Sequence, residues 1–372
     1  MDKKMLELYS DYMIVSSGQI TATAFSKILN GKYSHDQLTR FLSRNEFAED
    51  EHWSYIKPII RKHESDIDGI LAIDDTLLKK PYTDVSDLVC WHYDHTIGGV
   101  QKGIQMLNFL YCSANDTDDI SLPVAYELIH KPVLYSDLET KVLKRKAVYT
   151  KNEIMKERLS IIVNQQKLKF AYIAADMWFS SSDNMNFFHY ELKKKFVMGL
   201  KSNRNIALTK EDYLNGNWCK MSDIDMRSCD THLIYVKGID FPLSLIKLVP
   251  KNRDDSNSTY SYLVTDDLTL NYSEIHSIYQ KRWKVEEFHK SLKQNAKIEK
   301  SPTRTLLTQS NYIFLAVYTF VKLEMLKHKT KTNHFALKQQ LYIKSIQSVY
   351  KQMNLISEEL EAYKQQYSLL AA

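Results

Sequence analysis

The chain has 372 residues, enough to bury one large core or two to three smaller ones. Its composition is that of an ordinary globular protein, with 44% hydrophobic and 12% aromatic residues, and its net charge of +5 is only mildly basic. The four cysteines show no CxxC spacing, and the N-terminus lacks the apolar core of a signal peptide. The longest apolar run, residues 313–321, is too short to span a bilayer. We therefore expect a cytoplasmic protein with free thiols and no membrane association.

Residues 1–60 have the sequence pattern of helices. Two short amphipathic segments, 21–30 and 34–44, are separated by a turn that contains glycine. Two short helices across such a turn resemble a helix-turn-helix, whose second helix would offer Arg40 and Arg44 to DNA. A helical lid packed on the following domain is the alternative.

The next part of the chain alternates between apolar segments and acids. The first predicted strand ends in LAIDDT, which contains Asp74 and Asp75. Two further strands, a helical stretch at about 138–166, and a fourth strand ending in IAAD at Asp176 follow. This order resembles a ribonuclease H-like core, an α/β sheet with mixed strand directions. Residues 91–95 (WHYDH) lack a second ligand cluster with zinc spacing, so we expect a structural or DNA-adjacent loop there.

The second half of the chain begins with strands and ends with helices. Residues 195–266 read as strands separated by polar loops, which predicts a β-rich insertion. Asn271 and Glu274 form a capping-box pattern at the start of a predicted helix over 272–295. We expect five regions: 1–64, helical and DNA-binding; 65–194, first part of the core; 195–270, β-rich insertion; 271–325, remainder of the core; 326–372, a helical C-terminal region that is a candidate for dimerisation.

One face of the predicted 272–295 helix carries an unusual set of side chains. Within the stretch YQKRWKVEEFHKSLK, the positions i, i+3, i+7 and i+14 are occupied by Tyr279, Arg282, Glu286 and Lys293. At about 100° per residue, these four lie within an arc of roughly 60°. A carboxylate flanked by a guanidinium, an ammonium and a phenol is suited to holding phosphate oxygens beside a metal.

Three acids are candidates for that metal site. Asp75 ends the first strand, Asp176 ends the fourth, and Glu286 lies on the later helix. In a ribonuclease H-like sheet the ends of those two strands are adjacent, and a helix packed across them can bring the third acid. Three carboxylates suit Mg²⁺ or Mn²⁺, and two such ions can catalyse an in-line phosphoryl displacement. Asp74 is the fallback for Asp75, because neighbouring strand residues point to opposite faces.

These motifs resemble those of the DDE transposases of bacterial insertion sequences that carry the YREK signature, Y-x2-R-x3-E-x6-K. Tyr279, Arg282, Glu286 and Lys293 match that spacing without departure. The resemblance covers roughly residues 65–325. It implies that Asp75, Asp176 and Glu286 bind two Mg²⁺ ions, and that Arg282, Lys293 and Tyr279 hold phosphates.

The resemblance also implies a reaction and its partners. Double-stranded DNA would be nicked at the terminal inverted repeats, and the freed 3′-OH would then attack target DNA. In this group the flanking DNA usually leaves through a hairpin. Two ends must be paired, so we expect a homodimer in a synaptic complex near the nucleoid. A DNA-binding derivative without activity, and a nuclease that cuts without joining, are the alternatives.

Further cations lie around the same helix. Residues 279–304 contain eight cations and three anions, an excess equal to the net charge of the whole chain. Such an excess is typical of a polyanion-binding face, although a solvated lysine-rich helix is the alternative. We expect Lys290 and Lys297 to contact DNA. Trp283 either stacks on a displaced base or packs in the core.

Overall fold

A computed structural model describes residues 2–44, 47, 49–94, 97–113, 119–139, 141–224, 230–248 and 261–370. The α-helices are α1 (Lys3–Val15), α2 (Ala22–Ile28), α3 (His35–Arg44), α4 (Glu49–Ile60), α5 (Lys151–Ser160), α6 (Ser182–Asn186), α7 (Lys210–Asn215), α8 (Tyr272–Gln294), α9 (Leu306–Thr330) and α10 (His334–Leu370). The strands are β1 (Ile70–Lys79), β2 (Cys90–Asp94), β3 (Gly99–Cys112), β4 (Ser121–Leu128), β5 (Val133–Ser136), β6 (Leu143–Lys146), β7 (Tyr172–Ala175), β8 (Lys195–Leu200), β9 (Asn205–Ala207), β10 (Cys219–Lys220), β11 (Thr231–Val236), β12 (Leu243–Leu248) and β13 (Ser261–Thr265). Short 3₁₀ or π segments are η2 (Ile161–Gln165), η3 (Met177–Phe179), η4 (Phe187–Glu191) and η5 (Met221–Asp223).

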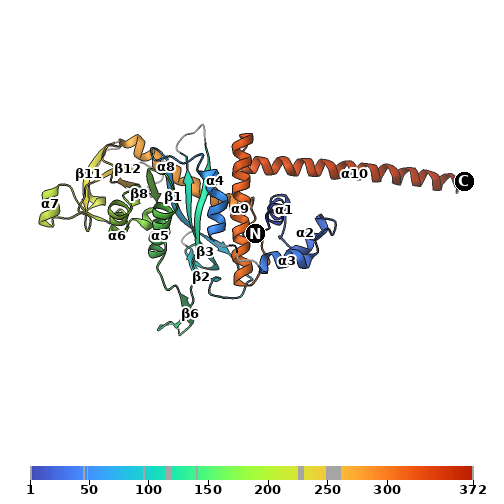
Figure 1. Cartoon of the computed structure of the whole chain (residues 1–372), viewed down its shortest axis with the longest axis horizontal. Coiled ribbons are helices and arrows are strands. Elements are labelled where there is room, and N and C mark those ends of the chain that lie inside the picture. The colour runs from blue at the N-terminus through green and yellow to red at the C-terminus, as the bar shows by residue number, and fades with distance from the viewer. Residues whose placement is uncertain are drawn as a thin grey trace.

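One mixed sheet runs through the body of the protein (Figure 1). Its strand order is β10-β9-β11-β12-β13-β8-β7-β1-β3-β2, and β4 pairs with the second half of β3. Strand β1 is antiparallel to β3 and parallel to β7, which is in turn parallel to β8. The predicted fold class, an α/β ribonuclease H-like core with a mixed sheet and helical regions at both ends, is confirmed by this arrangement.

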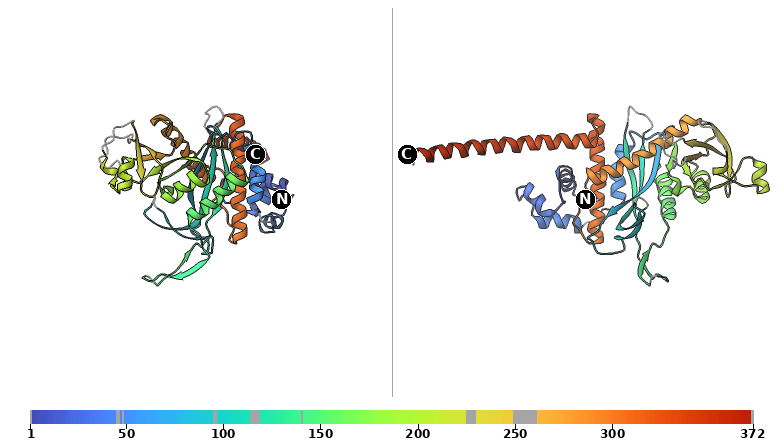
Figure 2. Two further views of the ribbon diagram at one scale, coloured as in Figure 1. Left: turned by 60° about the vertical axis from the view of Figure 1, so that its left-hand side comes forward. Right: turned by 180° about the vertical axis from the view of Figure 1, so that it is seen from behind.

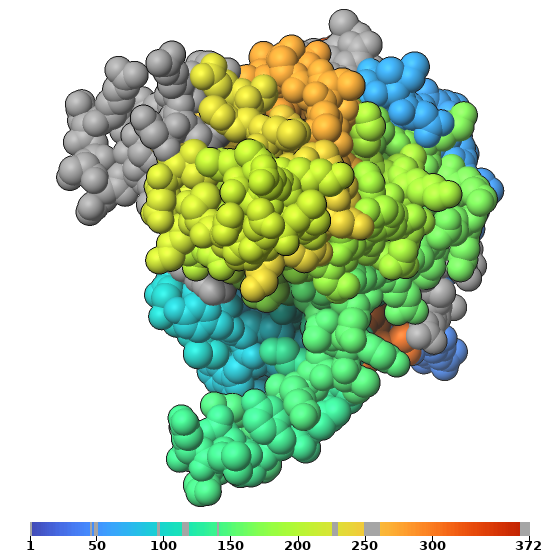
Figure 3. Space-filling view, turned by 90° about the vertical axis from the view of Figure 1, so that its left-hand side faces the viewer, coloured from blue at the N-terminus to red at the C-terminus, as the bar shows by residue number. Residues whose placement is uncertain are grey.

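The strands predicted between residues 195 and 266 are present, and they extend the core sheet. Strand β8 pairs with β7 on one side and with β13 on the other. Strands β12, β11 and β9 continue the sheet outward, and the short helix α7 interrupts what the sequence indicated as strands and loops only. Figure 3 shows this part of the chain, coloured yellow-green to yellow, as a lobe above the projecting β5–β6 hairpin.

The prediction of a continuous helix over residues 138–166 is wrong in its first part. Strands β5 and β6 form a separate two-stranded hairpin there, and the helix begins only at Lys151. Thr150 sets that boundary, because its side chain accepts a hydrogen bond from the Glu153 amide and Glu153 returns one to the Thr150 amide. The hairpin lies almost entirely at the surface, so its sequence has no alternating buried positions from which strands could be predicted.

Residues 91–94 belong to strand β2, which corrects the prediction of a loop for WHYDH. Main-chain pairing with the first residues of β3 determines this, since Cys90 lies opposite Gly103 and Asp94 lies opposite Gly99. His95 lies outside the described residues. The five-residue strand alternates between buried and less buried side chains, which is the pattern of a sheet with one covered face.

Two hydrophobic cores cover the two faces of β1. Leu71 and Ile73 belong to a core shared with α4 and α5, whereas Ala72 belongs to a core shared with α8 and α9. Continuing this alternation by two residues directs Asp74 toward α8 and Asp75 toward α5. The sheet therefore separates the two neighbouring aspartates.

The terminal regions are helical, as predicted. Helices α1 and α3 lie along α9, whose residues between Tyr312 and Glu324 are mostly buried. The last helix, α10, projects from the body as a long single rod (Figures 1 and 2). Among the described residues, no helix combines the length and hydropathy that crossing a membrane requires.

Candidate active site

The two aspartates of β1 have different partners. They lie in the middle of the strand, which continues to Lys79, so the prediction that the first strand ends at Asp75 is wrong: its pairing with β3 extends through Lys79 opposite Gly103. Asp74 accepts a hydrogen bond from Nη1 of Arg282 on α8 at 3.4 Å. Asp75 accepts one from Nζ of Lys151 at 2.9 Å and one from Nε2 of Gln105 at 2.5 Å. Asp74 thus faces the helix that carries Glu286, and Asp75 is engaged on the opposite face.

Asp176 lies beside Asp74 because of strand register. The parallel pairing of β1 and β7 ends with Ile73 opposite Ala175, so Asp74 and Asp176 are the next residues of two adjacent strands. Asp176 has extended backbone angles and caps η3 by accepting a hydrogen bond from the Trp178 amide at 2.9 Å. Its side chain is thereby fixed at the edge where the strand ends.

The electrostatics of this pair are those of crowded, buried acids. Burial, followed by the nearby Asp176 charge, raises the pKa of Asp74 to about 7. Burial also raises the pKa of Asp176, with a further contribution from Asp75, although the Trp178 amide and Arg282 oppose the rise. A cation placed between these carboxylates would relieve the repulsion.

Helix α8 supplies the third acid, Glu286, and the two cations of the predicted site, Arg282 and Lys293. The predicted capping box is present: Asn271 accepts from the Glu274 amide, and Glu274 accepts from the Asn271 amide. The helix buries Val285, Phe288 and Leu292 in the core that it shares with Ala72. That buried stripe fixes the rotation of the helix, so the neighbouring face meets the middle of β1 at Asp74 and the end of β7.

Arg282 is the centre of the cluster. Its guanidinium lies between two acids, donating from Nη2 to Oε1 of Glu286 at 3.1 Å as well as to Asp74. The ring of Tyr279 lies 5.2 Å from the guanidinium carbon. Arg282 is only 8% exposed, and its Nε has no partner within the described chain. A buried guanidinium with an unused donor is suited to binding a further oxygen, such as that of a phosphate.

Lys293 and Tyr279 mark the two ends of the α8 face. Nζ of Lys293 donates to the carbonyl of Leu77 on β1 at 3.1 Å and lies 3.8 Å from Glu299. At the other end, a Cβ on Gly199 of β8 would lie 3.4 Å from the Tyr279 hydroxyl and 3.1 Å from the Met177 amide. Glycine at this position therefore gives room to the Met177 backbone that follows Asp176, with the tyrosine hydroxyl at ordinary contact distance.

The donor set fits a hard divalent ion in type, although the acids are held apart. Asp74, Asp176 and Glu286 are all carboxylates, the ligands that Mg²⁺ and Mn²⁺ prefer. Among the residues that the structure describes, no three such side chains converge closely enough to hold a metal. The reason is visible in the contacts, because Arg282 bonds to Asp74 and Glu286 and occupies the space between them. Metal binding here requires the guanidinium to turn away.

The structure places the remaining predicted residues away from the acids. Trp283 is 59% exposed, so it does not pack in the core. Lys290 lies over the ring of Phe335 at the base of α10, and the carbonyl of Lys297 accepts a hydrogen bond from Tyr312. Arg40 and Arg44 are exposed on α3, Arg40 opposite the buried residues Leu38, Phe41 and Leu42 and Arg44 at their flank.

Sequence reasoning missed a polar pair beside the acids. Asn108 lies opposite Asp74 in the β1–β3 register and donates from Nδ2 to Nε2 of His289 at 2.9 Å. Burial, with Lys293 and Arg282 nearby, lowers the pKa of His289 to about 3, so this imidazole is neutral. His289 is one helical turn after Glu286, a signal that the sequence contained, whereas strand pairing alone reveals Asn108.

Lys151 and Trp178 form a second missed group on the α5 side. Nζ of Lys151 lies 4.3 Å from the centre of the Trp178 ring and also pairs with Asp75. Trp178 is half exposed, next to the strand-end Asp176.

Two family models match this chain. One, described as the transposase DDE domain, matches residues 131–320, and the other, described as the DDE superfamily endonuclease, matches residues 2–214. The chain belongs to the DDE transposase superfamily. As a DDE enzyme it is a nuclease or transposase that acts on DNA, and enzymes of this superfamily generally use divalent metal ions. No curated protein matches the sequence significantly.

Proposed function

We propose that this DDE enzyme is a cut-and-paste transposase whose metal-binding acids are Asp74, Asp176 and Glu286. The observation that carries the proposal is the Arg282 bridge between Asp74 and Glu286, next to Asp176 in strand register. The bridge joins Asp74 of β1 to the helix acid Glu286, and Asp176 lies beside Asp74 on the neighbouring strand. Asp75, the first choice from the sequence, is replaced by Asp74 in this proposal because its carboxylate is directed to Lys151.

The surrounding side chains suit the handling of a DNA phosphate. Arg282 and Lys293 offer charged donors from one helix face, and Tyr279 lies against the guanidinium. When two Mg²⁺ ions are bound, they would supply an activated oxygen nucleophile and stabilise the leaving oxygen. Arg282 would then exchange its carboxylate partners for a phosphate, and neutral His289, held by Asn108, would keep the adjacent turn of α8 in place.

The DNA partners follow from the same proposal. Helix α3 presents Arg40 and Arg44 to solvent, and we propose that it contacts the terminal inverted repeats. Trp283, Lys290 and Lys297 would contact DNA outside the acid cluster. A homodimer would pair the two element ends, and a hairpin on the flanking DNA would be one intermediate.

The test compares Glu286→Ala with Glu287→Ala on DNA that carries the element end. Glu286 is part of the cluster, whereas neighbouring Glu287 pairs with Lys284 on the adjacent helix face. We expect both variants to bind the DNA and only Glu286→Ala to lose nicking in Mg²⁺. Nicking preserved in Glu286→Ala would refute the assignment. Products joined through a 3′-OH would distinguish a transposase from a nuclease that only cuts.

A further inference from the structure

The last helix leaves the body and carries its apolar residues into solvent. Helix α10 has 37 residues, about 55 Å of helix, and Figure 2 shows its outer part extending beyond the other elements. Helices in proteins are stabilised chiefly by packing of an apolar face rather than by propensity. A lone helix of this length with exposed Ile, Val, Met and Leu side chains therefore lacks the surface that normally stabilises it.

The apolar residues follow a heptad repeat. Spacings of four and three alternate along the helix through Tyr342, Ile346, Val349, Met353, Ile356, Leu360 and Tyr363, and the sequence continues the pattern at Tyr367 and Leu370. From Ile346 to Tyr363 these side chains are between 51 and 64% exposed. Four heptads of a and d positions on one stripe are the signature of a coiled coil.

We infer that α10 pairs with α10 of a second copy of this chain as a parallel two-stranded coiled coil. The seam is self-complementary, since a two-fold axis along it would place each a and d residue against its equivalent. In this alignment Glu359, at a g position, faces Lys364, at the next e position of the other helix. The other g and e positions between residues 345 and 357 are uncharged, so no like charges oppose one another.

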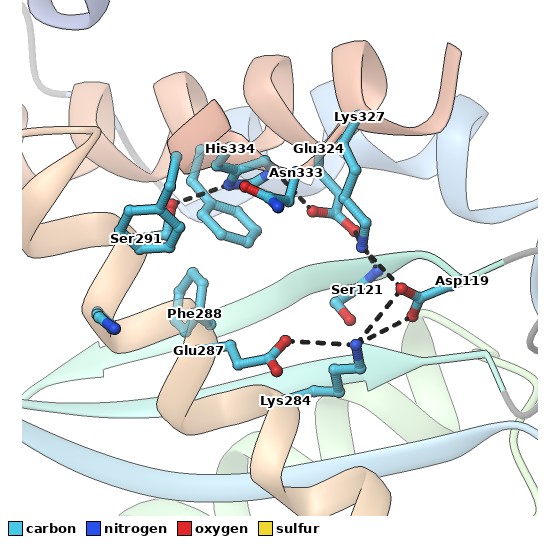
Figure 4. A pocket seen from close by; sticks show the side chains of 13 residues that line it. Asp119, Ser121, Lys284, Glu287, Phe288, Ser291, Glu324, Lys327, Asn333 and His334 are labelled. Atoms are coloured by element: carbon cyan, nitrogen blue, oxygen red, sulfur yellow. Dashed lines mark hydrogen bonds and ion pairs between the residues drawn. The ribbon is translucent and has the colours of Figure 1, made fainter. Parts of the chain in front are cut away.

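The base of α10 is fixed to the catalytic helix. His334, in its first turn, bonds through Nδ1 to the Ser291 hydroxyl of α8 at 2.8 Å and through Nε2 to Glu324 of α9 at 2.9 Å (Figure 4). One turn later, Nζ of Lys338 donates to the carbonyl of Gln294 at the end of α8 at 3.1 Å. His334, Ser291 and Glu324 border a cavity of about 510 Å³ between α8, α9 and the start of α10.

This anchorage gives the pairing a consequence for the reaction. Glu286 and Ser291 lie on the same rigid helix, so a coiled coil that joins two copies through α10 also sets the relation between two α8 helices. The inference thus rests on the proposed function, and it identifies the partner as a second copy of this chain. One coiled coil would hold two active sites together, one for each element end.

The test measures the mass of the full chain by light scattering without DNA or divalent metal. We expect the wild type to show twice the chain mass of 43.6 kDa. Ile356→Lys should weaken the dimer at least about 100-fold, because it buries an ammonium in the seam. Leu355→Lys is the matched control, since Leu355 is equally exposed but lies off the seam. Fluorescence-monitored unfolding checks that the main body of the protein remains folded in both lysine variants.

The parallel orientation of the two α10 helices is tested separately by cross-linking. Val349→Cys should form a disulfide between two copies in a parallel, in-register pair, whereas Lys351→Cys, on the outer face, should not. A monomeric wild type, a dimer equally sensitive to both lysine variants, or a Val349→Cys protein that does not cross-link would overturn the inference. Glu286→Ala must leave the mass unchanged, so a failure of the coiled coil and a failure of the chemistry are scored independently.

Discussion

Replacing Asp74 with asparagine should make the metal-free protein more stable while removing its activity. In the folded chain the pKa of Asp74 is raised to about 7, chiefly by burial and then by Asp176, from an ordinary value of 3.8. Between these two pH values the folded state keeps a proton that the unfolded chain has lost. The free energy of unfolding therefore falls as pH rises through this window, and the penalty is fully present above about pH 7.

The size of the effect follows from the same difference. At about 1.4 kcal/mol per pH unit, ionised Asp74 costs the fold up to roughly 4 kcal/mol above pH 7. Asparagine has no charge to bury, so Asp74→Asn should recover much of this lost free energy of unfolding. If Asp74 is a metal ligand as proposed, the same change should slow DNA nicking by at least about 1000-fold, since a metal contributes several kcal/mol to the transition state.

The assay is urea unfolding at pH 5 and pH 8, with and without Mg²⁺, beside a nicking assay. Asp75→Asn is the matched control. It removes the negative charge that pairs with Lys151 and one of the two oxygens that accept from Lys151 and Gln105, so it should lower stability by about 1–3 kcal/mol. Mg²⁺ should stabilise the wild type and not Asp74→Asn. The reasoning is refuted if Asp74→Asn nicks DNA normally, or if Asp75→Asn alone abolishes the Mg²⁺ response.

Three other changes test the supports of the site. Gly199→Ala should push against the Met177 backbone, next to Asp176, costing about 1–3 kcal/mol in thermal unfolding and reducing nicking; unchanged kinetics would exclude a role for that close packing. Glu324→Ala should cost about 3–5 kcal/mol in urea, because buried Glu324 accepts from His334, Lys327 and the Ser121 amide; a loss below 1 kcal/mol would contradict this. Asn271→Ala should cost about 1 kcal/mol in thermal unfolding by removing the N-cap of α8, whereas serine should retain most of the stability.

Local rules account for what the sequence predicted well. The capping pattern of Asn271 and Glu274 placed the start of α8, because a helix terminus is determined by residues within one turn of it. The strand that leads to Asp176 was visible as an apolar run, whereas the first strand continues past Asp75 to Lys79, because its pairing with β3 extends beyond the apolar run. Periodicity failed over residues 138–150, since the exposed β5–β6 hairpin has no buried face to produce a pattern.

By itself, the sequence determined the fold class and the family, because strand order and the spacing of Tyr279, Arg282, Glu286 and Lys293 are properties of the chain. Only the tertiary structure distinguished Asp74 from Asp75. Two adjacent strand residues are equivalent in sequence, and the face that each one meets depends on which helix packs there. The α8 side holds Arg282 and the α5 side holds Lys151, and these long-range contacts separate the two aspartates. The contact between Asn108 and His289 likewise depends on the tertiary structure, because strand pairing and helix packing bring together residues that are distant in the sequence.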